Sequence, residues 1–268
     1  MEIAFVFSGE IRFLKDNKDY LLDLKNKYNA DVFASFWEPD NIEDSELFVK
    51  TFNPIRYELE NKNIFYNTID QLMNDIDVPY GFIWDDECDR IKNGNLFFMT
   101  YKMWKSNSLT KTVGKEYDVV VRMRTDISLD SNFKFELNNY FNVPKMIVYI
   151  NSIPNNWGFS DTFSYSKPEI MDYYSSAMFH IISYIKEGCF IWTVENILRY
   201  HLNQKNIIVR QFVNHGFLHN NEGKITINPY VDVNRDSEVI TELFPITEKF
   251  DDKFYSYNNT GNIFKKKD

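Results

Sequence analysis

Residues 117–126 read YDVVVRMRTD and contain the strongest strand signal of the chain. Side chains of a strand alternate between its two faces, so the stretch divides into an apolar face and a charged face. The apolar face carries Val119, Val121 and Met123, and the charged face carries Arg122, Arg124 and Asp126. A continuous apolar run that ends in charges predicts a buried strand of a parallel sheet. Ligands bind at the carboxyl ends of such strands, which makes this exit a candidate site.

Two arginines in succession on one face of a central strand are costly unless something anionic meets them. We therefore interpret Arg122 and Arg124 as an anion site. The alternative is an internal ion-pair ladder with Asp118 or another carboxylate. Asp126 would oppose phosphate binding unless a divalent cation lay between carboxylate and phosphate, so we predict that it is a metal ligand. Taken alone, Asp126 would be read as a turn residue or a helix cap.

The segments on either side of this strand predict alternating strands and helices. Strands are expected at residues 3–7, 31–36, 56–60, 117–123, 146–150, 159–165 and 207–210, and helices at 14–28, 43–52, 88–112, 168–186 and 192–204. The β-α-β-α-β opening is typical of a parallel sheet with helices packed on its faces. We predict one α/β domain with a mainly parallel central sheet, over residues 1–245, followed by a C-terminal tail at 246–268.

The composition of the 268 residues narrows the class of partner. A formal net charge of -9 argues against nucleic acid, which binds basic surfaces, but allows a small phosphorylated ligand in one pocket. No apolar run approaches the roughly 20 residues of a membrane span, and the start of the chain lacks the basic region of a signal peptide. Cys88 and Cys189 fit no disulfide framework. We expect a cytoplasmic protein, free or peripheral at a membrane, in the host cytoplasm if the chain is viral.

The turn after the first strand, Ser8 to Arg12, reads SGEIR. Gly9 would let the backbone approach a ligand closely, and Arg12 could reach a phosphate. We therefore include Ser8, Gly9 and Arg12 among the candidate ligand-binding residues. The alternative for Arg12 is a solvated charge at a helix start. The Gly-rich dinucleotide fingerprint and the phosphate loop GxxxxGK[ST] are both absent from the sequence.

The order of these motifs resembles a GT-A-type glycosyltransferase. The resemblance covers about residues 1–205 and rests on the SGxxR turn, DVFxxxW from Asp31, YDVVVRMRTD and WGFSDTFSYSKPEIM from Trp157. The sequence is most similar to the bacterial and large-virus enzymes that build surface polysaccharide, including lipopolysaccharide-synthesis proteins of the WavE type. It implies a nucleoside diphosphate sugar as donor, a glycan or lipid-linked acceptor and a divalent cation, Mn²⁺ or Mg²⁺. Arg124 stands where the superfamily carries the first aspartate of its metal motif.

Two carboxylates are candidates for the catalytic base that such a transfer needs. An inverting transfer requires a group that removes the proton of the acceptor hydroxyl. The resemblance implies a donor-sugar or acceptor pocket at WGFSD, which contains Asp161, and an acidic residue near the acceptor at the position of Glu195. The alternatives are a loop-capping role for Asp161 and a favourable helix-start charge for Glu195.

Three further side chains are candidates for the site. Trp157 could stack on a sugar ring, although a tryptophan in a strand is more often core. Lys102 and Ser106, one helical turn apart, could face the donor sugar, with a solvated polar face as the alternative. The resemblance implies that a C-terminal histidine can complete the metal shell, which makes His219 a candidate ligand.

The sequence thus predicts an enzyme that transfers a sugar from a nucleoside diphosphate donor. A cation at the diphosphate, metal or arginine, would stabilise the departing group. Two other functions stay open. One is a catalytically silent nucleotide- or glycan-binding protein of the same fold, because the aspartate pair of the metal motif is incomplete. The other is a nucleotidyltransferase, which would use a similar sheet but normally has a more basic phosphate loop.

Overall fold

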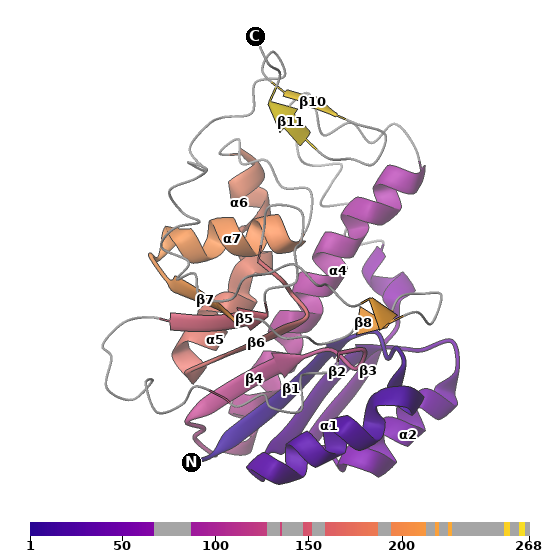
Figure 1. Cartoon of the computed structure of the whole chain (residues 1–268). Coiled ribbons are helices and arrows are strands. Elements are labelled where there is room, and N and C mark those ends of the chain that lie inside the picture. The colour runs from indigo at the N-terminus through magenta and orange to yellow at the C-terminus, as the bar shows by residue number, and fades with distance from the viewer. Residues whose placement is uncertain are drawn as a thin grey trace.

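A computed structural model describes residues 1–66, 87–127, 135, 147–151, 159–186, 194–212, 218–219, 225–226, 255–257 and 263–265. Its centre is a seven-stranded sheet in the order β3-β2-β1-β4-β6-β5-β7 (Figure 1). The strands are β1 (Ile3–Gly9), β2 (Asp31–Trp37), β3 (Arg56–Glu60), β4 (Val119–Met123), β5 (Ile147–Asn151), β6 (Phe163–Ser166) and β7 (Ile208–Phe212). β6 is antiparallel to both of its neighbours, and the other neighbouring pairs are parallel. The predicted α/β class with a mainly parallel sheet is confirmed.

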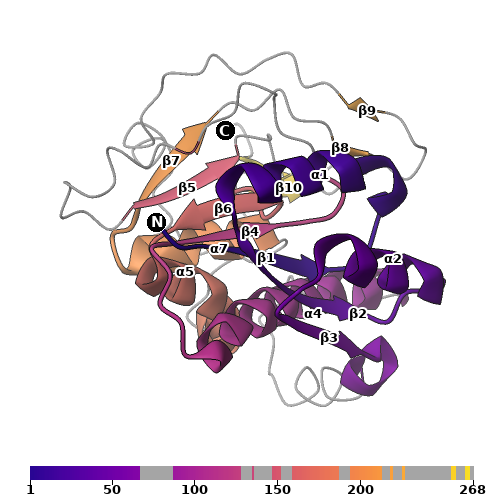
Figure 2. The ribbon, with the colours of Figure 1, turned by 90° about the horizontal axis from the view of Figure 1, so that it is seen from below.

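Helices cover both faces of this sheet, as the view in Figure 2 shows. On one face lie α1 (Leu14–Tyr28) and α2 (Ile42–Phe52), and on the other lie α4 (Glu87–Leu109), α5 (Pro168–Ser175), α6 (Ile181–Lys186) and α7 (Val194–Gln204). The alternation of β4 divides its side chains between two cores. Val121 packs with Phe7 and Phe48 on the α1 side, and Val120 packs with Val6 on the α4 side.

The predicted boundaries agree closely over the first half of the chain and diverge later. Helix 14–28 and strand 56–60 have the predicted limits. The predicted helix at 168–186 is instead α5, a 3-10 helix at Ser176–His180 and α6. The hydroxyl of Ser176 donates to the Tyr173 carbonyl at 2.7 Å, which marks the point where the regular helix stops. The predicted strand at 159–165 begins only at Phe163, because residues 159–162 form the approach to β6.

Two short strand pairs lie outside the main sheet. β8 (Leu218–His219) pairs with β9 (Ile225–Thr226), and β10 (Tyr255–Tyr257) pairs with β11 (Ile263–Lys265), both antiparallel. β10 and β11 fall within the predicted tail, and its boundary at residue 245 lies outside the described residues. In the parts of the chain that the structure describes, no helix combines the length and the apolar character that a bilayer crossing requires.

Candidate active site

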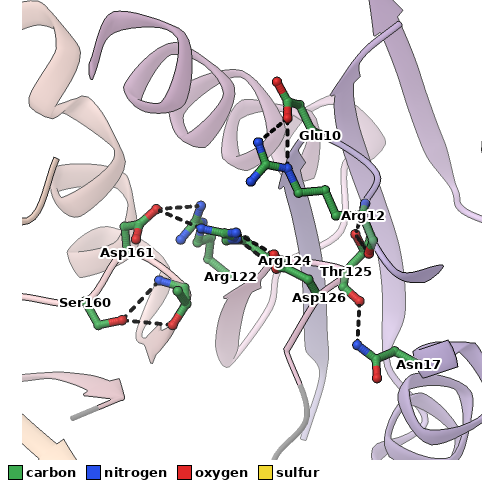
Figure 3. A network of polar contacts seen from close by, with 10 residues as sticks. Glu10, Arg12, Asn17, Arg122, Arg124, Thr125, Asp126, Ser160 and Asp161 are labelled. Atoms are coloured by element: carbon green, nitrogen blue, oxygen red, sulfur yellow. Dashed lines mark hydrogen bonds and ion pairs between the residues drawn. The ribbon is translucent and has the colours of Figure 1, made fainter. Parts of the chain in front are cut away.

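The candidate site lies at the edge of the sheet where β1, β2, β3 and β4 end. These strands are parallel, so their carboxyl ends meet at one edge. β6 runs in the opposite direction, so its beginning lies at this same edge, beside the end of β4. The backbone N–H of Arg124 donates to the Thr162 carbonyl at 3.1 Å, which continues the ladder past the end of β4. The reversal of β6 therefore brings Asp161 to the two arginines (Figure 3).

Arg122 is a buried cation whose partners leave part of its guanidinium unused. It lies on the α4 side of β4, and 2% of its side chain is exposed. Its Nε donates to the Ser8 hydroxyl at 3.0 Å. Its Nη2 lies 3.9 Å from Oδ2 of Asp161, too far for a hydrogen bond, and Nη1 has no hydrogen-bond partner in the described structure. A buried guanidinium with an unused nitrogen suits a site that a ligand completes.

Arg124 is the accessible cation of the pair. Its side chain is 21% exposed, whereas those of Arg122, Asp126 and Asp161 are 2–3% exposed. Its Nε donates to Oδ1 of Asp126 at 2.8 Å, and Nη2 donates to Oδ2 of the same carboxylate. Burial acts against the charged form, but Asp126 and Asp161 outweigh it and raise the pKa of Arg124. Arg124 is thus a permanent positive charge at the surface of the site.

Asp161 and Glu195 both lie near the arginines. Oδ2 of Asp161 is 3.9 Å from Nη2 of Arg122 and 3.9 Å from Nη1 of Arg124. It accepts no hydrogen bond in the described structure. The backbone N–H of Phe159 donates to the Glu195 carbonyl at 3.0 Å, which fastens the approach to β6 onto the start of α7. Glu195 is close enough that its charge contributes to the raised pKa of Arg124.

Tyr174 of α5 forms part of the buried floor behind Arg122. Its side chain is fully buried, and this burial raises its pKa to about 12 while the Arg122 charge acts in the opposite direction. Ser164, the register partner of Arg122 on β6, is also buried. The floor therefore supplies neutral hydroxyl groups, and the charge of the site resides in the arginines and carboxylates.

Thr125 and Asn17 join the first turn to the end of β4, and the sequence analysis missed both. The hydroxyl of Thr125 accepts from the Arg12 backbone N–H and donates to the Arg12 carbonyl, each at 2.9 Å. The side-chain amide of Asn17 donates to the Thr125 carbonyl at 3.1 Å. A signal for Asn17 was available, because it occupies a buried position in the stripe that Leu14 and Leu21 continue on α1.

Arg12 lines a cleft at the ends of β1, β2 and β3, and Gly9 directly precedes Glu10 of its wall. Gly9 has φ 103°, a conformation that favours glycine, and nothing lies within 4 Å of where its Cβ would be. The cleft has a volume of about 660 Å³. Its walls are formed by Glu10, Ile11, Arg12, Trp37, Glu38, Pro39, Asp40, Asn41, Asp44, Asn61, Lys62 and Asn63. Burial favours the neutral form of Glu10, but Arg12 and Lys62 outweigh it and lower its pKa.

Ser8 and Lys102 are buried rather than open to this cleft. The Ser8 hydroxyl accepts from Arg122, so Ser8 supports a cation and is 1% exposed itself. The Lys102 ammonium donates to Glu60 at 2.7 Å, to the Phe36 carbonyl at 2.8 Å and to Ser35 at 3.2 Å. It also lies 4.2 Å from the centroid of the Trp37 ring. Burial lowers the pKa of Lys102, with Glu60 acting against the shift.

The remaining predicted residues are described incompletely or have other contacts. Trp157 lies outside the described residues. The backbone of His219 forms part of β8, and its side chain lies outside the described residues. Ser106 is buried and donates to the Met103 carbonyl at 3.2 Å, within its own helix. The structure thus brings Arg122, Arg124, Asp126, Asp161 and Glu195 together.

The described residues do not fit a divalent cation at Asp126. Both carboxylate oxygens of Asp126 already accept hydrogen bonds from Arg124. The nearby Oδ2 of Asp161 faces two guanidinium groups, whose charge repels a metal ion. Within the ranges that the structure describes, no three His, Cys, Asp or Glu side chains lie close enough together to hold a metal. The candidate role of His219 as a metal ligand stays a prediction, because its side chain lies outside those ranges.

The solved structures similar to this chain include two enzymes of low sequence identity. No protein-family model matches the sequence, and no curated protein matches it. Mouse xyloside xylosyltransferase 1, in its apo form, is 10% identical with a TM-score of 0.41, over 78% of this chain and 84% of that one. Core-mannan synthase A from Aspergillus fumigatus, in its manganese and GDP form, is 11% identical with a TM-score of 0.45, over 78% and 72%. At these values neither structure identifies the substrate or metal requirement of this chain.

Proposed function

We propose that the chain is a glycosyltransferase that moves a sugar from a nucleoside diphosphate donor to a hydroxyl of a glycan or lipid-linked acceptor. The observation that carries the proposal is the pair Arg122 and Arg124 at the carboxyl edge of the sheet. One of these arginines is buried and incompletely bonded, and the other is exposed to a ligand. Fixed positive charges in a site of low exposure stabilise a leaving diphosphate better than solvated ones do.

The adjoining cleft supports a nucleoside as the other half of the donor. Its volume of about 660 Å³ is within the range of small-molecule sites. The Asn61 amide is already bonded through both its nitrogen and its oxygen, so Asn63 is the lining amide that can offer a donor and an acceptor to a base or a ribose. Arg12 belongs to the cleft wall and its backbone is hydrogen-bonded to Thr125, the neighbour of Arg124. Cleft and arginines therefore lie along one continuous edge.

Asp161 is the proposed base of an inverting transfer. The acceptor oxygen forms a bond to the anomeric carbon, and the bond from that carbon to the diphosphate oxygen breaks. The electron pair leaves with the diphosphate, and the hydroxyl proton goes to Asp161. Its Oδ2 accepts no hydrogen bond in the described structure, which leaves it able to take that proton. Glu195 is the second candidate, because it is close enough to act on Arg124 electrostatically.

A panel of nucleoside diphosphate sugars tests the function directly. We expect release of a nucleoside diphosphate with at least one donor, faster when an acceptor glycan is present. Wild type should be compared with Asp161→Asn, which keeps the shape of the side chain and removes its basicity. Binding without turnover would indicate the silent nucleotide- or glycan-binding protein instead. Release of pyrophosphate from a nucleoside triphosphate and a sugar phosphate would indicate a nucleotidyltransferase.

Donor affinity tests the placement of the diphosphate. We expect Arg124→Ala to weaken donor binding by about tenfold or more, since a hydrogen bond between charged groups contributes about 1.5–3 kcal/mol. Arg12→Ala should have a smaller effect, because the Arg12 side chain is 45% exposed against 21% for Arg124 and solvent screens its charge more. Isothermal titration calorimetry with the donor found in the panel measures both. Unchanged affinity in the Arg124 variant would remove the diphosphate from this position.

A further inference from the structure

We infer that Arg124 and Arg122 hold the diphosphate without a divalent cation, and that Asp126 positions Arg124 instead of binding a metal. The inference rests on the proposed function and concerns how that site recognises its donor. It reverses the expectation for Asp126, because the structure shows what its carboxylate contacts.

The geometry of Arg124 and Asp126 is that of a matched fork. Nε and Nη2 of Arg124 donate to the two different oxygens of Asp126. Such a bidentate pair fixes the plane of the guanidinium as well as its position. A metal ion at Asp126 would have to displace one or both of these bonds while lying beside the permanent charge of Arg124. Asp126 is therefore better suited to hold Arg124 in place than to bind a metal ion.

Because Nε and Nη2 of Arg124 are bonded to Asp126, Nη1 is the nitrogen left to bind a ligand. Among the described residues Nη1 of Arg124 donates no hydrogen bond, and it lies 3.9 Å from Oδ2 of Asp161. Nη2 of Arg122 lies at the same distance from that oxygen, and Nη1 of Arg122 is unbonded. Two guanidinium groups thus converge on one region in which neither has completed its hydrogen bonds (Figure 3). Phosphate oxygens are acceptors of the kind that these nitrogens lack.

The exposed fractions of the Arg124 and Asp126 side chains indicate which of the two a ligand from solvent meets first. Arg124 is 21% exposed, and Asp126 beneath it is 3% exposed. A diphosphate that arrives from solvent meets the arginine first and is shielded from the carboxylate. A hydrated divalent cation would meet the same positive side chain first, which disfavours its approach. Asp126 acts from behind Arg124, as a counter-charge in the empty site and as a support in the filled one.

The experiment measures the affinity of UDP and of GDP for the full-length protein by isothermal titration calorimetry. Each titration is run in excess EDTA and again in excess MnCl₂. We expect at least one nucleotide to bind, with dissociation constants in the two buffers that agree within about threefold, less than the tenfold of one charge-assisted hydrogen bond. This readout needs no turnover and no acceptor.

Three variants separate the roles of the residues. Arg124→Ala should weaken binding about tenfold or more in both buffers, and Arg124→Lys should recover part of the loss. Asp126→Asn keeps one acceptor oxygen for Arg124. Because Asp126 binds no metal under this inference, the affinities of this variant in EDTA and in MnCl₂ should stay equal to each other. Lys115→Ala removes one positive charge at the opposite edge of the sheet, where Lys115 pairs with Glu2 and Asp31, and should change neither affinity.

The outcomes distinguish the inference from the proposed function. Binding that is at least about tenfold tighter in MnCl₂, with that gain lost in Asp126→Asn, would overturn the inference and leave the proposed function standing. Failure of both nucleotides and of the whole donor panel to bind in either buffer would overturn both. Circular dichroism of each variant separates lost binding from lost folding, and the comparison of buffers on wild type does not depend on any variant.

Discussion

Two buried cations lie near the carboxyl edge of the sheet, both on the face covered by α4, and their surroundings differ. Lys102 approaches Ser35 of β2, and Arg122 approaches Ser8, the register partner of Ser35 on β1. Among the described residues, the ammonium of Lys102 has three oxygen partners and lies over two aromatic rings. In the same part of the chain, Arg122 has one hydrogen bond, one unbonded nitrogen and a carboxylate 3.9 Å away.

The difference indicates which cation supports the fold and which is held for a ligand. A buried charge whose hydrogen bonds are all made is stabilised by its partners and has no donor left for a ligand. A buried charge with unfilled hydrogen-bonding capacity is costly unless the function uses it. We therefore assign Lys102 to the architecture of β2, β3 and α4, in place of the predicted contact with the donor, and Arg122 to the site.

The largest expected effect is on stability at Lys102. Lys102→Ala removes a fully buried side chain and leaves the Ser35 and Phe36 oxygens without their donor. We expect a loss of about 4 kcal/mol in the free energy of unfolding, as for other large-to-small changes that also break a buried ion pair. Urea denaturation measures it. Lys105→Ala, on the same helix with a partly exposed pair to Glu58, should cost less than about 1 kcal/mol.

His201 of α7 is a third buried polar side chain, and both of its ring nitrogens have hydrogen-bond partners, as the ammonium of Lys102 does. Its Nε2 faces the Tyr173 carbonyl at 2.7 Å, so Nε2 carries the proton and donates, while Nδ1 accepts from the Tyr184 hydroxyl at 2.8 Å. Burial, more than any other cause, lowers its pKa to about 4.

The lowered pKa of His201 predicts a pH-dependent stability. The unfolded chain takes up this proton near pH 6.5 and the folded chain only near pH 4. The contribution is therefore full above pH 6.5 and is lost as the pH falls toward 4, by up to about 3 kcal/mol at 1.36 kcal/mol per unit. Urea denaturation across this range, on wild type and His201→Gln, isolates the difference. Equal slopes in the two proteins would contradict the assignment.

Measurement of kcat tests the role of Asp161, whose Oδ2 accepts no hydrogen bond in the described structure. Asp161→Asn should lower kcat by about 100-fold, the lower bound for loss of a general base. Its affinity for a nucleoside diphosphate should not weaken, because a negative charge beside the arginines is removed. Glu195→Gln should have a smaller effect on kcat. Full turnover in Asp161→Asn together with loss in Glu195→Gln would transfer the role of base to Glu195.

The smallest expected effect compares the two register-paired serines. Ser8→Ala removes the only hydrogen-bond acceptor of Arg122 that the structure describes and should cost about 1 kcal/mol of stability. Ser35→Ala should cost less, because Lys102 keeps Glu60 and the Phe36 carbonyl. Thermal unfolding of both variants measures the difference. A larger loss for Ser35→Ala would mean that Arg122 does not depend on Ser8.

The site shows where prediction from sequence stopped. The charged face of YDVVVRMRTD was recognised because charges at a strand exit have a local pattern, whereas Asp161 of WGFSD was a candidate only through the family resemblance. Asn17 and Thr125 were missed because their hydrogen bonds join residues 108 and 113 apart in the chain. Lys102 was interpreted as a solvent or donor contact, since helical spacing gives no indication of which neighbour a long side chain will reach.

The sequence by itself determined the α/β class, most element limits up to β4 and the placement of Arg122 and Arg124 at a strand exit. Each of these depends on periodicity within a few residues, which the chain carries locally. Only the tertiary structure decided that β6 runs antiparallel and so places Asp161 beside the arginines. It also decided that Asp126 faces Arg124 with both oxygens. The distance between charges fixes whether a carboxylate binds a metal or an arginine, and that distance is set by packing between segments that no local pattern relates.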